Sequence, residues 1–179
     1  MAVLLVGLTE DVGAVLIKRL IDEDDEVRVV ESDDGLAVEW ETLGAHVALG
    51  ELDDEDLLER AGQYARTMVV FTEGRAEHAL DPAVAAARRA RIERVVVVAA
   101  GLSDETGLAL LRASGLQYVA LDVARTRKGF IRRSGLEADR LAEAIDAADD
   151  LAGEPRLELD LADAGAWSAL RLEPPATPR

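Results

Sequence analysis

A short glycine-containing stretch near the amino end is the first candidate for chemistry. It reads Val6-Gly7-Leu8-Thr9-Glu10-Asp11-Val12-Gly13, and it joins an apolar run to a segment with helical periodicity. A strand, a tight turn and a helix in this order present the first backbone N–H groups of the helix to a ligand, where they can bind phosphate. Gly7 would permit the turn, and Gly13 would let the helix pack closely against the strand. The residues expected to contact a phosphate-carrying ligand are Gly7, Thr9, Glu10, Val12 and Gly13.

Glu10 stands where dinucleotide-binding loops have a glycine that lets the backbone approach the pyrophosphate. Its side chain adds bulk and a charge of the same sign as the phosphates. Two like unit charges 4 Å apart cost about 4 kcal/mol at an effective dielectric constant of 20. Two alternatives stay open. Glu10 and Asp11 cap their own helix and fill the anion site, or Glu10 turns to solvent and NAD binds weakly.

Further positions would complete a dinucleotide site. Glu31 ends the second strand-like run, 24 residues after Gly7, where an acidic residue bonds the ribose hydroxyls and repels a 2′-phosphate. NADP is therefore disfavoured, since no arginine or lysine occurs between Glu31 and Gly35. Thr72 and Gly74 follow the fourth strand-like run and would line the same cleft. A second interpretation assigns Glu31 simply to an acidic surface.

Strand-like and helix-like segments alternate along most of the chain. This alternation predicts a doubly wound α/β fold in one domain, residues 1–165, with six or seven mainly parallel strands and a loose tail over 166–179. We expect the first strand to be central and the fifth to be fully buried. The expected strands are Val3–Leu8, Glu26–Glu31, His46–Leu49, Thr67–Thr72, Arg94–Ala100, Leu116–Leu121 and Arg156–Leu161, the last at an edge. The expected helices are Val12–Ile21, Leu36–Leu43, a helix that begins at Asp53 or Asp54 and runs to Ala61, Ala83–Ala90, Ser103–Ser114 and Ser134–Ala148. Asp53 or Asp54 is the expected N-cap of the third helix, Asp81 that of the fourth with Pro82 at its first position, and residues 134–137 form a capping box for the last.

Charge is distributed unevenly. The net charge is −16, and residues 22–59 contain 16 acids and one base, which argues against nucleic acid as a partner. Arg125–Arg133 contains five bases and no acid. This basic stretch could bind an anionic ligand, an acidic protein or the acidic block of a second copy in a homo-oligomer. Both charged segments also fit a simpler interpretation as solvated surface.

Several classes of protein are disfavoured by composition. The chain has no cysteine, and its two histidines, His46 and His78, do not share a ligand spacing, so we expect no metal site. No apolar run has the roughly 20 residues that a membrane span requires. No basic segment precedes the first strand, so we expect a cytoplasmic protein without a signal peptide or membrane contact.

The loop over residues 6–13 resembles the Thr-Gly-Ala-Thr-Gly-x-x-Gly loop of atypical, extended short-chain dehydrogenases, especially their NmrA-like branch. Gly7, Thr9 and Gly13 match, whereas Val6 and Glu10 replace the threonine and a glycine of that loop. The resemblance continues in order to about residue 160, and it implies an NAD(P)-binding Rossmann fold. It also implies that Glu51 stands where the family has an adenine-contacting aspartate. The other similar stretches are Glu26–Val30, Leu43–Leu52, Ala85–Val96, Leu111–Tyr118 and Ile131–Ile145.

The resemblance does not extend to the catalytic residues of that family. Its reductases use a Tyr-x-x-x-Lys pair, but here Tyr64 is followed four residues later by Met68, and Tyr118 by Asp122. Ala99-Ala100 replaces the serine at the end of the fifth strand. We therefore predict no residue in a standard catalytic role.

Three functions remain after this comparison. The first is a non-catalytic Rossmann module for nucleotide sensing or assembly. The second is a divergent NAD-dependent oxidoreductase or epimerase-type enzyme. The third is a nucleotide-gated regulatory domain, because Leu52–Arg66 is similar to the third helix and following strand of TrkA-type nucleotide-binding domains. The second half of the chain favours the dehydrogenase relationship over the third alternative.

Overall fold

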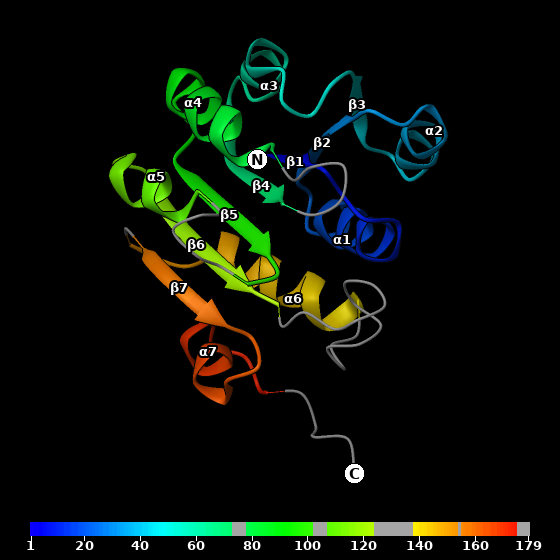
Figure 1. The fold of residues 1–179 in the computed structure, drawn as a ribbon. Helices are drawn as coiled ribbons and strands as arrows, with labels where there is room; N and C mark the ends of the chain where they lie inside the picture. Colours follow the sequence, from blue (N-terminus) through cyan, green and yellow to red (C-terminus); the bar gives the residue numbers. More distant parts are fainter. Residues whose placement is uncertain (73–77, 102–106, 124–137, 154, 175–179) are drawn as a thin grey trace.

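Seven parallel strands form one sheet in the order β3-β2-β1-β4-β5-β6-β7 (Figure 1). The computed structural model describes residues 1–72, 78–101, 107–123, 138–153 and 155–174. The strands are β1 (Ala2–Val6), β2 (Glu26–Glu31), β3 (His46–Leu49), β4 (Ala65–Phe71), β5 (Arg94–Ala99), β6 (Gln117–Asp122) and β7 (Arg156–Asp160). This arrangement confirms the predicted doubly wound α/β fold, with every strand pair parallel.

Helices cover both faces of the sheet. The first face packs against α1 (Glu10–Asp22), α2 (Asp34–Thr42), α6 (Ala138–Asp149) and α7 (Ala164–Ala169). The second face packs against α3 (Glu55–Ala61), α4 (Leu80–Ala90) and the described helix α5 (Leu108–Ala113). None of the helices in the described ranges is long and apolar enough to span a membrane.

The apolar runs of the sequence become the buried strands. All residues of β1 and β5 are buried, as strands of a parallel sheet with both faces covered should be. β1 lies inside the sheet, where Val6 is opposite Val30 of β2 and Val70 of β4. β7 alternates between exposed and half-buried residues, which confirms the predicted edge strand.

Two segments differ from the sequence-based expectation. Helix α4 begins at Leu80, so Asp81 and Pro82 lie inside its first turn and Asp81 is not its N-cap. The missing N–H of a proline costs nothing there, because first-turn N–H groups have no acceptor within the helix. Residues 166–170 are not a loose tail, since α7 buries Trp167 and Leu170 in the core. The predicted capping box at residues 134–137 lies outside the described residues.

A buried polar network joins the end of α6 to the amino ends of two strands. The Asp149 carboxylate accepts hydrogen bonds from Arg66 and from the Thr67 hydroxyl. The Arg94 guanidinium donates to the backbone oxygens of Asp149 and of Leu151, the latter at 2.6 Å. Helix α6 belongs to the connection between β6 and β7. This network holds the carboxyl end of α6 against the amino ends of β4 and β5.

Replacing Asp149 with alanine should lower the free energy of unfolding by about 3–5 kcal/mol, because Arg66 would lose its buried partner. Asp150 is a matched control, since its side chain is 67% exposed and lies 3.9 Å from Arg66. Asp150→Ala should change stability by no more than about 0.5 kcal/mol. Urea unfolding of both variants checks this difference, and equal losses would contradict the role assigned to Asp149.

Candidate functional site

The candidate site lies at the carboxyl ends of β1, β2 and β4. From β1 the chain continues into α1 on one face of the sheet, whereas the helix after β4, α4, packs on the other face. Neighbouring parallel strands whose connections diverge in this way leave a crevice between them, and ligands of open α/β sheets bind there. The loop from Gly7 to Thr9 stands at this point, beside the end of β2 on one side and Thr72 on the other.

The loop itself is built to present donors. Gly7 has a positive φ of 72°, a conformation that favours glycine, so the predicted tight turn is present. Thr9 is the N-cap of α1, and its backbone oxygen accepts from the Gly13 N–H at 2.8 Å.

Several polar groups at the start of α1 have no partner in the part of the chain that the structure describes. The N–H groups of Glu10, Asp11 and Val12 have no acceptor among the described residues. The Thr9 Oγ1 atom is buried without a hydrogen-bond partner there. Three backbone donors and a hydroxyl at a helix N-terminus suit a bound anion such as phosphate.

The two carboxylates of the first turn do not occupy this position through hydrogen bonds. Glu10 and Asp11 are exposed, and no hydrogen bond or ion pair joins either carboxylate to a residue in the described part of the chain. Of the two alternatives that the sequence leaves open, this geometry fits a solvent-facing Glu10 better than a self-capped helix. The charge of Glu10 nevertheless stays next to the donors.

Gly13 and Val12 contribute differently from expectation. The Val12 side chain is buried in the core, so only its N–H can face a ligand. Gly13 lies against the indole of Trp40 in α2, and a Cβ built on Gly13 would lie 2.6 Å from Cη2 of that ring. The glycine therefore provides room for a helix α2 side chain, in addition to any close approach of α1 to the sheet.

Glu31, at the end of β2, is fully buried and already holds three protein donors. Its Oε1 accepts from the N–H groups of Ser32 and Asp33 at 2.8 and 3.0 Å. Its Oε2 accepts from Trp40 Nε1 at 3.3 Å. A carboxylate offers about four acceptor sites. Most acceptor sites of the Glu31 carboxylate therefore hold the turn into α2 in place. A ribose hydroxyl that bonded to Glu31, as predicted, would have to bind beside these donors.

The remaining predicted residues are distributed along the same edge. Glu51 is exposed just after β3, one strand further from β1 than Glu31. Thr72 is half-buried after β4, and its N–H donates to the Val98 oxygen at 3.0 Å. Gly74 and the basic stretch Arg125–Arg133 lie outside the described residues.

Both tyrosines of the chain lie away from this edge. The Tyr118 hydroxyl, near the start of β6, donates to Glu158 at 3.1 Å. Burial raises the pKa of Tyr118, and the hydrogen bond to Glu158 raises it further. Hydrogen bonds from Arg112 hold the pKa of Glu158 below its usual value. Tyr64 is 91% exposed and immediately precedes β4, so it lies at the amino ends of the strands, opposite the candidate site.

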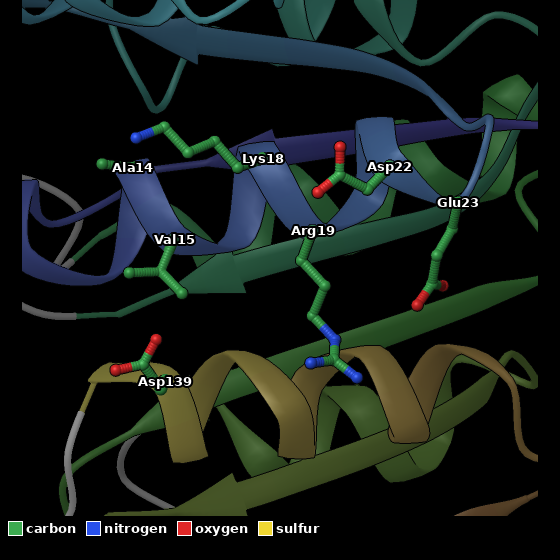
Figure 2. A pocket seen from close by; sticks show the side chains of 7 residues that line it. All are labelled: Ala14, Val15, Lys18, Arg19, Asp22, Glu23 and Asp139. Carbon is green, nitrogen blue, oxygen red and sulfur yellow. The ribbon is translucent and has the colours of Figure 1, made fainter.

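A polar groove of about 530 Å³ runs between α1 and α6, apart from the strand ends (Figure 2). In Figure 2 the Arg19 side chain reaches from α1 toward α6, where it pairs with Asp146 at 2.6 Å, whereas Lys18 points away. Burial and the neighbouring Asp146 raise the pKa of Glu23. Because Arg19 binds the buried carboxylate, these charges hold the two helices together. The groove is lined by Ala14, Val15, Lys18, Arg19, Asp22, Glu23 and Asp139.

Comparison with protein families gives a match from the start of β1 to the end of β6. Residues 3–122 match the TrkA-N domain, which is more than half of the chain. The chain belongs to the TrkA-N domain family. The alternative based on Leu52–Arg66 is therefore confirmed at the level of the family, although sequence reasoning ranked the dehydrogenase relationship above it. No curated protein matches this TrkA-N chain.

Solved structures of reductases and an epimerase share the fold. ChuY, an anaerobillin reductase from Escherichia coli O157:H7, is 17% identical with a TM-score of 0.66, over 100% of both chains. The Citrobacter sp. triphenylmethane reductase complexed with NADP(H) is 14% identical with a TM-score of 0.68, over 89% of this chain and 69% of that one. A nucleoside-diphosphate-sugar epimerase from Staphylococcus aureus is 15% identical with a TM-score of 0.65, over 89% and 71%. These likenesses show that the TrkA-N domain has the NAD(P)-binding Rossmann fold.

Gly13→Ala should destabilise this TrkA-N domain by about 1–2 kcal/mol, because the clash with Trp40 outweighs the helix-propensity gain of alanine. Gly165→Ala is the matched control, since the nearest atom to its added Cβ lies at 3.5 Å, an ordinary contact. That substitution should be neutral or stabilise by about 0.5–1 kcal/mol. Thermal unfolding of both variants measures the contrast, and a neutral Gly13→Ala would refute the close contact.

Proposed function

We propose that this TrkA-N domain is a nucleotide-sensing module that binds NAD at the carboxyl ends of β1 and β2 and does not itself transfer hydride. The unpartnered donors at the start of α1 carry this proposal. The N–H groups of Glu10, Asp11 and Val12 and the Thr9 hydroxyl could donate hydrogen bonds to a pyrophosphate. They would replace the hydrogen bonds of water with donors in a fixed arrangement. The family match and the fold support a dinucleotide as the ligand.

The residues at the end of β2 support a preference for NAD over NADP. Glu31 and Asp33 are acidic, and residues 31–35 contain no lysine or arginine. A 2′-phosphate on the adenosine ribose would therefore add negative charge beside two carboxylates without a base from this turn. Glu31 acts mainly by holding the turn in place, so Ser32 and Asp33, which are exposed, are the groups that meet the ribose.

The positions of the acid–base groups support a role without hydride transfer. The Tyr118 hydroxyl donates a hydrogen bond to Glu158, and Tyr64 lies at the amino ends of the strands, away from the proposed site. Ala99 and Ala100 stand at the end of β5 in place of a hydroxyl side chain. Neither tyrosine can give a proton to a substrate oxygen at the proposed site. Binding can then serve as a signal instead of a first step of turnover.

Removing the charge of Glu10 should strengthen NAD binding. Glu10 is exposed, so the relevant dielectric is close to that of water, where two unit charges at 4 Å repel by about 1 kcal/mol. Glu10→Gln should therefore bind NAD about fivefold more tightly at low ionic strength, and salt should reduce the gain. Asp11→Asn, which removes the other acidic charge of this turn, is the control. We expect Glu10→Gly to gain at least as much, because it removes bulk as well as charge.

Isothermal titration calorimetry with NAD and NADP measures these affinities. NAD binding that is equal in wild type and both Glu10 variants would mean that the phosphates do not approach the start of α1. NADP binding tighter than NAD would contradict the role of the acidic turn after β2.

The purified domain should not oxidise NADH or NADPH when carbonyl substrates are supplied. The expected result is a rate equal to that of the buffer alone, because no tyrosine can protonate the product oxygen. Absorbance at the reduced-nicotinamide band follows the reaction. Sustained, substrate-dependent oxidation that is lost on Thr72→Val would instead support a divergent oxidoreductase, while leaving the NAD site in place.

A further inference from the structure

The outer side of β3 is an open edge of the sheet. Among the described strands, β3 pairs only with β2 and ends the strand order (Figure 1). The Gly50 N–H donates to the Glu31 oxygen at 2.9 Å, so residues 46 and 48 also direct their backbone groups toward β2. Backbone direction alternates along a strand, and Val47 and Leu49 therefore direct their N–H and C=O groups outward.

The two edges of the sheet differ in chemistry. β7, at the other edge, exposes Arg156, Glu158 and Asp160, and such charges discourage pairing with another chain. β3 has no acidic or basic residue other than His46. Its Leu49 is 55% exposed, and Val38 on the neighbouring helix α2 is 63% exposed. This edge lacks the protection that the chain places on β7.

Exposed acidic side chains occur on α2 and in the loop after β3, the two segments that flank the open edge strand in the sequence. Residues 32–54 contain seven acids and no lysine or arginine. Helix α2 covers one face of the sheet here, and α3 covers the other. Among the described residues, no ion pair neutralises four exposed acids of this region, Asp34, Glu41, Glu51 and Asp53.

We propose that the β3 edge binds an extended, lysine- or arginine-rich segment of a partner protein, which adds to the sheet as an eighth strand. Backbone hydrogen bonds to Val47 and Leu49 would hold the segment in register, and alternate side chains would reach the two faces. Basic side chains on it would meet the acids, and an apolar one would cover Leu49. A second copy of this chain is disfavoured, because pairing two β3 edges brings two acidic regions together.

The probe is a fluorescently labelled peptide of sequence KVKVKVK, with EVEVEVE as its charge-reversed control, and binding is followed by fluorescence anisotropy on the full chain. The basic peptide should bind and the acidic one should not. Raising the salt from about 50 to about 500 mM should weaken binding about tenfold, because the acids are exposed.

Val47→Pro removes an outward N–H without breaking a bond to β2, and an edge strand tolerates such a proline. It should weaken peptide binding about tenfold, whereas Val47→Thr, which keeps the N–H, should not. The double variant E41K/D53K should abolish binding, and D139K/E173K, which changes the net charge equally at distant exposed sites, should retain it. These charge variants keep the test valid if Val47→Pro fails to fold.

Four results would overturn the proposal. One is the absence of KVKVKVK binding, and another is equal binding by D139K/E173K and E41K/D53K. The third is full binding by a folded Val47→Pro variant, which would show electrostatic adsorption without strand addition. Concentration-dependent dimers that Val47→Pro abolishes would assign the edge to a second copy and equally contradict a basic partner. The outcome is independent of NAD binding, since β3 carries none of the phosphate donors.

Discussion

The Trp40 indole touches the two ends of the proposed nucleotide site at once. Its ring lies against the backbone of Gly13 in the first turns of α1, and its Nε1–H bonds the buried carboxylate of Glu31 at the end of β2. Glu31 in turn binds the two N–H groups that begin the turn into α2. One side chain therefore contacts both the helix that carries the proposed phosphate donors and the acidic turn that would meet the ribose.

The groups gathered at the proposed site are suited to binding. Its donors are backbone N–H groups and one hydroxyl, and these are fixed by the geometry of α1 and need no particular side chain at each position. Apart from Glu31, the charged side chains with buried partners lie away from the site. Asp149 fixes the end of α6 at the amino ends of the strands. Glu158 of β7 accepts hydrogen bonds from Tyr118 and Arg112. A Rossmann fold that hosts reductases elsewhere can in this way retain binding without acid–base catalysis.

Sequence alone predicted most of the fold, because buried parallel strands have continuous apolar runs and turns have recognisable residues. His46–Leu49 is observed with the predicted bounds, and Asp54 caps α3, one of two aspartates considered for that role. The predicted N-cap of α4, Asp81, was wrong, because the helix begins at Leu80. Proline is tolerated elsewhere in the first helical turn as well as at the first helical position. Helix α7 was missed because its core contact depends on Trp167, whose partners are distant in the sequence or lie on other elements.

The positions of the site residues were predicted better than their roles. Gly7, Thr9 and Glu10 lie at the end of β1 as their spacing indicates, because a strand–turn–helix fixes its own geometry. Burial of Glu31 by Trp40 could not be inferred, since it depends on how α2 packs against α1. A glycine in a helix together with the only tryptophan of the following helix was the available signal, but it does not by itself reveal a contact.

Nuclear magnetic resonance of the ¹⁵N-labelled chain during titration with NAD tests whether the start of α1 binds the dinucleotide. We expect progressive shifts of the amide signals of Glu10, Asp11 and Val12 and of the Trp40 indole N–H. The Trp167 indole N–H, which donates to the Leu161 oxygen at 3.0 Å in another part of the core, should stay unchanged. Saturating NAD that leaves the first-turn amides of α1 unshifted, or that shifts signals only at the amino edge of the sheet, would contradict binding at the start of α1.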